Sequence, residues 1–263
     1  MSLQRSDALK AIFLTVTMSV VLTGCGQSAK PNVLQAHQTT LPEMTMDSIK
    51  FNTEGWQSVQ LTNDRQAWQN NSREEISLHC NHNPPDLPCP LTDLVGLRNY
   101  YRLCADRSGA GLVSCDPIAI KGISCLKVIC KVPQQPSGMA YVGTIVMPFS
   151  QGSYTIKVQS QERGITGQRE SFVLDKMMSK GLVGVDERTG KLTNWEKDPY
   201  DPKIHTRVMV NPAEAERYDS AFPAHPLSRV RRILNGIMMS MQVSDDLTRL
   251  VPFMGPLPEG ELK

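Results

Sequence analysis

Apolar and polar residues alternate along several segments of the chain, which is the pattern of strands with one buried face. The alternation is clearest at 75–80 and weaker at 66–69. After residue 122, further strands follow one another with Gly- and Pro-containing turns between them, which favours an antiparallel sheet. The strands expected in that region are 126–132, 140–146 and 154–159.

Three other segments carry apolar residues at helical spacing. The first follows Thr92, which can cap a helix, and extends to Cys104. The second occupies 169–180, and the third begins at Pro226, a residue favoured in the first turn of a helix. The pattern predicts an α+β fold, an antiparallel sheet packed by helices with an appended C-terminal helix. The inner side expected of the second helix consists of Phe172, Leu174, Met177 and Met178.

The N-terminal segment has the features of an export signal. Arg5 and Lys10 precede an uncharged apolar run, 11–22, which is too short to span a bilayer. The run ends in the residues Leu22-Thr23-Gly24-Cys25, which resemble the lipobox of bacterial lipoproteins. The resemblance implies that Cys25 is acylated and becomes the first residue of the mature chain.

A lipid anchor at Cys25 implies a particular location for the protein. Gly26 follows the cysteine, and lipoproteins of Gram-negative bacteria without Asp at that position usually reach the outer membrane. We therefore expect a protein anchored there by lipid and facing the periplasm. The organisation expected is a signal peptide at 1–24, a flexible tether at 25–50, an α+β domain at 51–182, and a turn-rich extension with an amphipathic helix at 183–263.

Composition supports a folded domain and excludes some partners. Of 263 residues, 40% are hydrophobic and 21% are charged, which is typical of a globular chain and not of a disordered one. The 28 basic residues nearly balance the 26 acidic residues. Because no strong positive field results, we expect no nucleic-acid partner.

Six cysteines follow Cys25, and an even number in an exported chain favours disulfides. Spacing does not decide the pairing, although Cys80 could join Cys89 or Cys104. A metal site at Cys80 is not expected, because the adjacent His79 points to the opposite face of a strand. The six disulfide candidates are Cys80, Cys89, Cys104, Cys115, Cys125 and Cys130.

The order of the predicted elements resembles the PsbP-like fold, which photosystem II extrinsic proteins share with the bacterial lipoprotein DcrB. The residues that carry the resemblance are the helix at 92–104, the turn at Gly122, the hairpin at 139–160 and the helix at 169–180. It covers roughly residues 55–182 and implies an α/β/α sandwich. The six cysteines and the segment that continues to Lys263 depart from that pattern.

Motifs of common enzymes are missing from the sequence, which contains no GxSxG, HExxH, GxGxxG or P-loop pattern. The most distinctive loop, 163–170, has two glycines and two arginines at a helix start. It could hold an anion, but its plainer interpretation is a turn followed by a helix cap. We expect no enzymatic activity, no cofactor and no metal.

The remaining hypothesis is a tethered binding module with a protein partner. In its predicted location and architecture, the chain resembles immunity lipoproteins that neutralise antibacterial effectors, notably phospholipases delivered by the type VI secretion system. Such a protein would occlude its effector through anchors in loops, for which the candidates are Arg163, Arg169, Trp195 and Tyr200. The alternatives are a DcrB-like structural or assembly lipoprotein of the envelope, and a binder of a small ligand or metal.

Replacing Cys25 with Ser is expected to abolish incorporation of labelled palmitate and to release the protein from the membrane fraction. The acyl chains provide the membrane affinity, since each buried methylene contributes about 0.8 kcal/mol. Cys89→Ser is the matched control and should label like the wild type. Labelling that persists in Cys25→Ser would contradict the lipobox interpretation.

Overall fold

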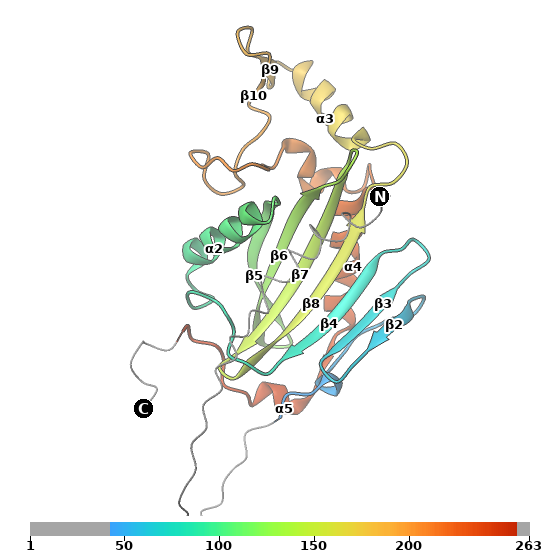
Figure 1. The fold of residues 1–263 in the computed structure, drawn as a ribbon, viewed down its shortest axis with the longest axis vertical. Helices are drawn as coiled ribbons and strands as arrows, with labels where there is room; N and C mark the ends of the chain where they lie inside the picture. The colour runs from blue at the N-terminus through green and yellow to red at the C-terminus, as the bar shows by residue number, and fades with distance from the viewer. Residues whose placement is uncertain (1–42, 257–263) are drawn as a thin grey trace, which may run out of the picture.

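The computed structural model describes residues 43–256, which form one sandwich around a seven-stranded antiparallel sheet (Figure 1). The order of strands across the sheet is β2-β3-β4-β8-β7-β6-β5. The predicted α+β class, with a sheet packed by helices, is therefore confirmed. The strands of the sheet are β2 (Gln57–Leu61), β3 (Arg65–Gln69), β4 (Glu75–Asn81), β5 (Gly111–Ile120), β6 (Ile123–Pro133), β7 (Met139–Phe149) and β8 (Gly152–Gln161).

The helices and short elements complete the chain around this sheet. Within residues 43–256 no helix is both long enough and apolar enough to cross a membrane. The α-helices are α2 (Leu94–Arg107), α3 (Gln168–Met178), α4 (Pro226–Ser240) and α5 (Asp245–Thr248). The other elements are η1 (Met46–Ser48), β1 (Ile49–Lys50), β9 (Gly184–Val185), β10 (Leu192–Thr193), η2 (Pro212–Glu214), η3 (Glu216–Tyr218) and β11 (Gln242–Val243).

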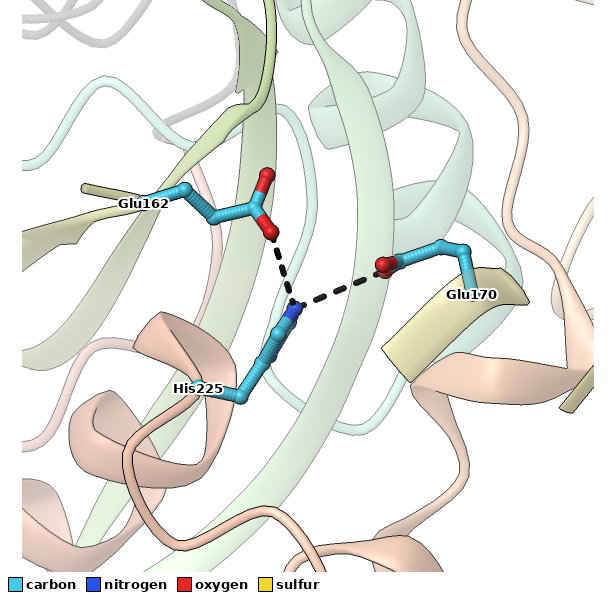
Figure 2. A group of neighbouring side chains, drawn as sticks. All are labelled: Glu162, Glu170 and His225. Carbon is cyan, nitrogen blue, oxygen red and sulfur yellow. Dashed lines mark ion pairs between the residues drawn. The ribbon is translucent and has the colours of Figure 1, made fainter. Parts of the chain in front are cut away.

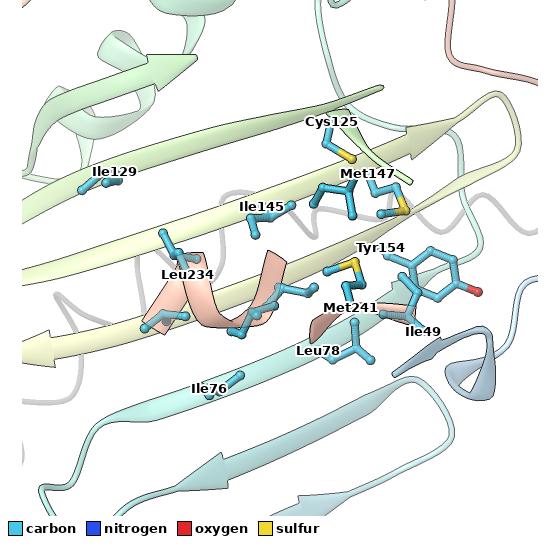
Figure 3. Close-up of a cluster of buried hydrophobic side chains, with 14 of the residues drawn as sticks. Ile49, Ile76, Leu78, Cys125, Ile129, Ile145, Met147, Tyr154, Leu234 and Met241 are labelled. Atoms are coloured by element: carbon cyan, nitrogen blue, oxygen red, sulfur yellow. The ribbon is translucent and has the colours of Figure 1, made fainter. Parts of the chain in front are cut away.

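Alternation along the strands divides the sheet residues between two faces. On β8, Tyr154 and Ile156 face the main core, whereas Thr155 and Lys157 point to the opposite side. The main core lies between the sheet and α4, as Figure 3 shows. A second apolar cluster around Leu97 joins α2 to the other face. The α/β/α layering expected from the sequence is present.

The predicted end of the tether at residue 50 is wrong, and the predicted C-terminal extension packs into the sandwich. Met44 and Ile49 are buried in the main core, and β1 pairs with β11, so the expected tether does not continue to residue 50. The predicted tether residues 25–42 and the signal peptide lie outside the described residues. The helix at 226–240 starts where predicted, but it forms one layer of the sandwich and buries Leu227 and Leu234 against the sheet. The part of the predicted extension that the structure describes, residues 183–256, is therefore integral to the fold.

Gly143 allows α4 to lie close to the centre of the sheet. A Cβ atom at this position on β7 would lie 2.5 Å from Leu234 Cδ1 and 2.6 Å from Val230 Cγ1. Both of these side chains are fully buried. The absence of a side chain at 143 is therefore a packing requirement.

Gly143→Ala is expected to lower the free energy of unfolding by about 1–3 kcal/mol, because the added methyl group overpacks the contact with α4. The matched control is Gly236→Ala within α4, where an added Cβ meets no atom within 4 Å. That substitution should raise stability by about 0.5–1 kcal/mol through helix propensity. Urea unfolding of both variants measures the two changes in the free energy of unfolding. Equal changes at positions 143 and 236 would contradict the packing requirement at Gly143.

Candidate functional site

Residues 165–193, here called the arm, project from one end of the sandwich (Figure 1). The arm comprises α3, the β9–β10 hairpin and the loops that join them. It has a small core of its own, in which Val173 and Val183 pack with Trp195 and Ala213. This core joins the arm to the segment that precedes α4.

The outer surface of the arm carries exposed apolar side chains. Phe172 and Met178 were expected on the inner side of their helix, but they lie on its outer side, and Phe172 is 52% exposed. Its ring has an edge contact with Phe222. Exposed apolar groups that gather on one feature are typical of interaction surfaces. The exposed apolar residues of the arm are Ile165, Phe172, Met178, Leu182, Val185 and Leu192.

Arg169 was predicted as a partner contact, and this prediction is wrong because its side chain is completely buried. Its Nε donates to the carbonyl oxygen of Ala213, and Nη2 donates to that of Ala215 at 2.9 Å. Nη1 donates to Ser228 Oγ at 2.8 Å and lies 2.9 Å from Asp219 Oδ1. Arg169 therefore fixes the base of the arm to η2, η3 and α4.

Trp195 and Tyr200 are also poor candidates for partner contacts. Trp195 is only 8% exposed, since it fills the core of the arm. The ring of Tyr200 lies under the Arg98 guanidinium, 3.8 Å from its central carbon, and its hydroxyl accepts a hydrogen bond from the Cys115 backbone N–H. Only Arg163 is exposed as predicted, and it donates to the carbonyl oxygens of Ser72 and Arg73.

The six predicted disulfide cysteines carry free thiols in this structure. Cys80 faces the main core, whereas Cys89 and Cys104 lie on the α2 side of the sheet, so both pairs suggested for Cys80 are wrong. Burial raises the pKa of Cys125 to about 12, which keeps this thiol protonated and poorly nucleophilic. The same burial raises the pKa of Cys115 and of Cys130 to about 12. Cys25, the predicted site of lipidation, lies outside the described residues.

The space between α2 and the sheet offers little room for a ligand. Its pocket is lined mainly by apolar side chains, among them Tyr101, Val128 and Val142. The volume is about 70 Å³. Pockets that bind small organic molecules usually have volumes of about 300–1,000 Å³. This pocket gives no support to the small-ligand alternative.

Three ionisable side chains that are distant in the sequence meet beside the base of the arm, as Figure 2 shows. Glu162 follows β8, Glu170 lies in the first turn of α3, and His225 is the N-cap of α4. His225 Nε2 is 3.4 Å from Glu170 Oε1 and 3.9 Å from Glu162 Oε1. These three residues are called the Glu–Glu–His cluster below.

Backbone N–H groups orient two members of the cluster, Glu162 and His225. The carboxylate of Glu162 accepts a hydrogen bond from Met139 N–H at 2.8 Å and another from Gly167 N–H at 2.9 Å. His225 Nδ1 accepts from Leu227 N–H at 3.3 Å.

Sequence reasoning missed this cluster and predicted no metal site. Glu170 ends the loop 163–170 that was identified for its arginines, and Glu162 directly precedes that loop, but His225 is distant along the chain. The only local signal was the position of His225 directly before Pro226, where a side chain can cap the helix. Cys80 faces the main core, and its neighbour His79 lies on the opposite face of β4.

Replacing Arg169 with Ala is expected to lower the free energy of unfolding by about 3 kcal/mol or more, because the buried carbonyl oxygen of Ala213 loses its donor and the missing side chain leaves a cavity. The Ala215 carbonyl and Asp219 each lose one of several donors. Arg163→Ala, which removes an exposed guanidinium from the same loop region, should change stability by no more than about 0.5 kcal/mol. Chemical unfolding measures both values. A small effect at Arg169 would show that this network does not hold the base of the arm.

Comparisons with known proteins identify no family. No protein-family model matches the chain, and no curated protein matches it. Among solved structures, the chain is similar to the solution structure of cyanobacterial PsbP (CyanoP) from Synechocystis sp. PCC 6803, with a TM-score of 0.33 and 14% sequence identity. The match covers 60% of this chain and 94% of that chain. The α+β class is established by the strands and helices themselves, and the PsbP-like and DcrB-like resemblance stays a prediction.

Proposed function

We propose that this protein is a lipid-anchored, non-enzymatic binding module that faces the periplasm from the outer membrane. Its partner is an antibacterial effector of the type VI secretion system with phospholipase activity, and the protein acts as the immunity protein that occludes it. The observation that carries the proposal is the exposed apolar surface of the arm. The leader with its lipobox supports the proposed location at the outer membrane.

The composition of this surface supports a partner that acts on lipids. A phospholipase needs an apolar cleft to accept acyl chains, and Phe172, Leu182 and Val185 offer apolar side chains of complementary character. Burying these groups in the cleft would remove apolar surface of both proteins from water. An inserted arm would exclude the lipid substrate by occupying the same space.

The rigid base of the arm supports the same proposal. Binding loses less conformational entropy when the binding surface is ordered beforehand. Here buried contacts of Arg169, rather than disulfides, hold the arm. The adjoining segment is fixed by a buried ion pair in which Arg102 Nε lies 2.6 Å from Asp198 Oδ2.

The decisive experiment uses the full chain and a secreted phospholipase of the same bacterium, the first candidate being the product of a neighbouring gene. The wild-type chain should inhibit phospholipid hydrolysis at equimolar concentration and protect cells that carry the enzyme in the periplasm. Phe172→Asp and Leu182→Asp place a charge in the apolar contact and should each weaken binding about 30-fold or more, as for an interface hot spot.

The matched controls are Val95→Asp and Leu103→Asp, which introduce the same charge at exposed apolar positions of α2. They should inhibit the enzyme like the wild type. If the α2 variants weakened binding as much as the arm variants, the contact would not lie specifically on the arm. A chain that neither binds nor protects against any such enzyme, but purifies with envelope proteins alone, would favour the structural or assembly role instead.

A further inference from the structure

We infer that the Glu–Glu–His cluster is a binding site for a divalent transition-metal ion, with zinc as the best-fitting ion. One imidazole nitrogen and two carboxylate oxygens form a donor set that zinc uses in proteins. All three donor atoms lie within 4.8 Å of one another. The site is independent of the proposed partner of the arm.

The separations between the donor atoms suit a tetrahedral ion. Zinc bonds of about 2.0–2.2 Å at tetrahedral angles place neighbouring ligand atoms about 3.4 Å apart. His225 Nε2 and Glu170 Oε1 are separated by 3.4 Å, and His225 Nε2 and Glu162 Oε1 by 3.9 Å. The donor oxygens of the two carboxylates lie within 4.8 Å of each other, so carboxylate movements of at most about 1.4 Å complete the three-ligand geometry.

Two polar atoms of the cluster are buried without a hydrogen-bond partner. They are His225 Nε2 and Glu170 Oε2. The His225 side chain is only 5% exposed, and Nε2 points between the two carboxylates, as Figure 2 shows. Buried polar groups are rarely left unsatisfied, so each such atom needs an explanation. A cation bound between the carboxylates would engage Glu170 Oε2, and His225 Nε2 once the imidazole proton has moved to Nδ1.

Charge balance favours a cation in the same position. Two carboxyl groups share this largely buried site, and a divalent ion would balance the charge of both. The neighbouring arginines are already engaged with other groups. Arg169 pairs with Asp219, Arg229 Nε lies 2.6 Å from Glu74 Oε1, and Arg163 donates to carbonyl oxygens.

The hydrogen bonds around the cluster are compatible with metal binding. Each oxygen of Glu162 accepts one backbone bond and keeps a second lone pair, and these bonds orient the carboxylate as outer-shell partners do in metal sites. The bond from Leu227 N–H to His225 Nδ1 places the imidazole proton on Nε2. When the ion takes Nε2, this proton moves to Nδ1 and the bond from Leu227, already long, is lost.

An ion can reach the cluster from solvent. A pocket of about 320 Å³ is lined by Glu162, Gln168 and His225 and opens beside the start of α3. The ion would join the end of β8, the first turn of α3 and the N-terminus of α4. It would thereby fasten the base of the arm to the sandwich.

Cobalt is the most informative probe, because its absorption spectrum distinguishes ligands. Metal-free full-length protein titrated with Co²⁺ should bind one ion per chain, with the visible bands of a tetrahedral or five-coordinate site, and Zn²⁺ should displace it. No thiolate-to-cobalt charge-transfer band should appear, which separates this site from the six cysteines. Zn²⁺ should also raise the unfolding temperature of the wild type.

Glu170→Gln and His225→Asn should each weaken Co²⁺ binding at least about tenfold. Asn keeps an N-cap acceptor for α4 and so preserves the helix start, and Glu170 is partly exposed, so its variant should fold. The matched control is His82→Asn, which removes an exposed histidine 3.3 Å from Asp64 and should bind like the wild type. Absence of binding, a thiolate band, or equal affinity of the wild type and both cluster variants would overturn the inference.

Discussion

The fold depends on the burial of one apolar face of the sheet beneath α4. Tyr154 and Ile156 on β8 and Ile145 on β7 would be open to water without this helix. The close approach of Leu234 over Gly143 makes the two surfaces fit. Because the chain must reach its last third before this face is covered, residues 183–240 are part of the folding unit. The β1–β11 pair then joins residues 49–50 to residues 242–243.

A second constraint is that charged groups buried between these layers must be paired. Lys131 Nζ and Glu214 Oε1 are 3.0 Å apart, and Tyr141 donates to the same carboxylate. Arg169 and the pair of Arg102 with Asp198 act in the same way. An unpaired charge at any of these places would be strongly destabilising, so the pairs fix the turn-rich segment in one position. The arm thus projects from a rigid base.

The two proposals concern neighbouring parts of this base. The outer surface of the arm offers apolar side chains to a partner, while the Glu–Glu–His cluster lies beneath, where α3 meets α4. A metal ion at the cluster would order the same element that carries the binding surface. Either property can exist without the other, because no residue of the cluster belongs to the exposed apolar set.

Local patterns in the sequence were sufficient for most elements. Alternation located β4, β6, β7 and β8, and helical spacing located α2 and α4, because these patterns reflect which face of an element is buried. β5 was missed, since Asp116 and Pro117 interrupt its apolar run, as an edge strand allows. The position of residues within loops was a poor guide to exposure, because Arg169 and Trp195 lie in polar, turn-rich sequence and are nevertheless buried.

The sequence by itself determined the α+β class, the central strands, the start of α4, and the motif that predicts an anchor at Cys25, because each is encoded by neighbouring residues. Only the tertiary structure decided which apolar residues remain exposed on the arm and which cysteines share a side of the sheet. It also brought His225 to Glu162 and Glu170. The physical reason is that such contacts join residues far apart along the chain, and no local period records them.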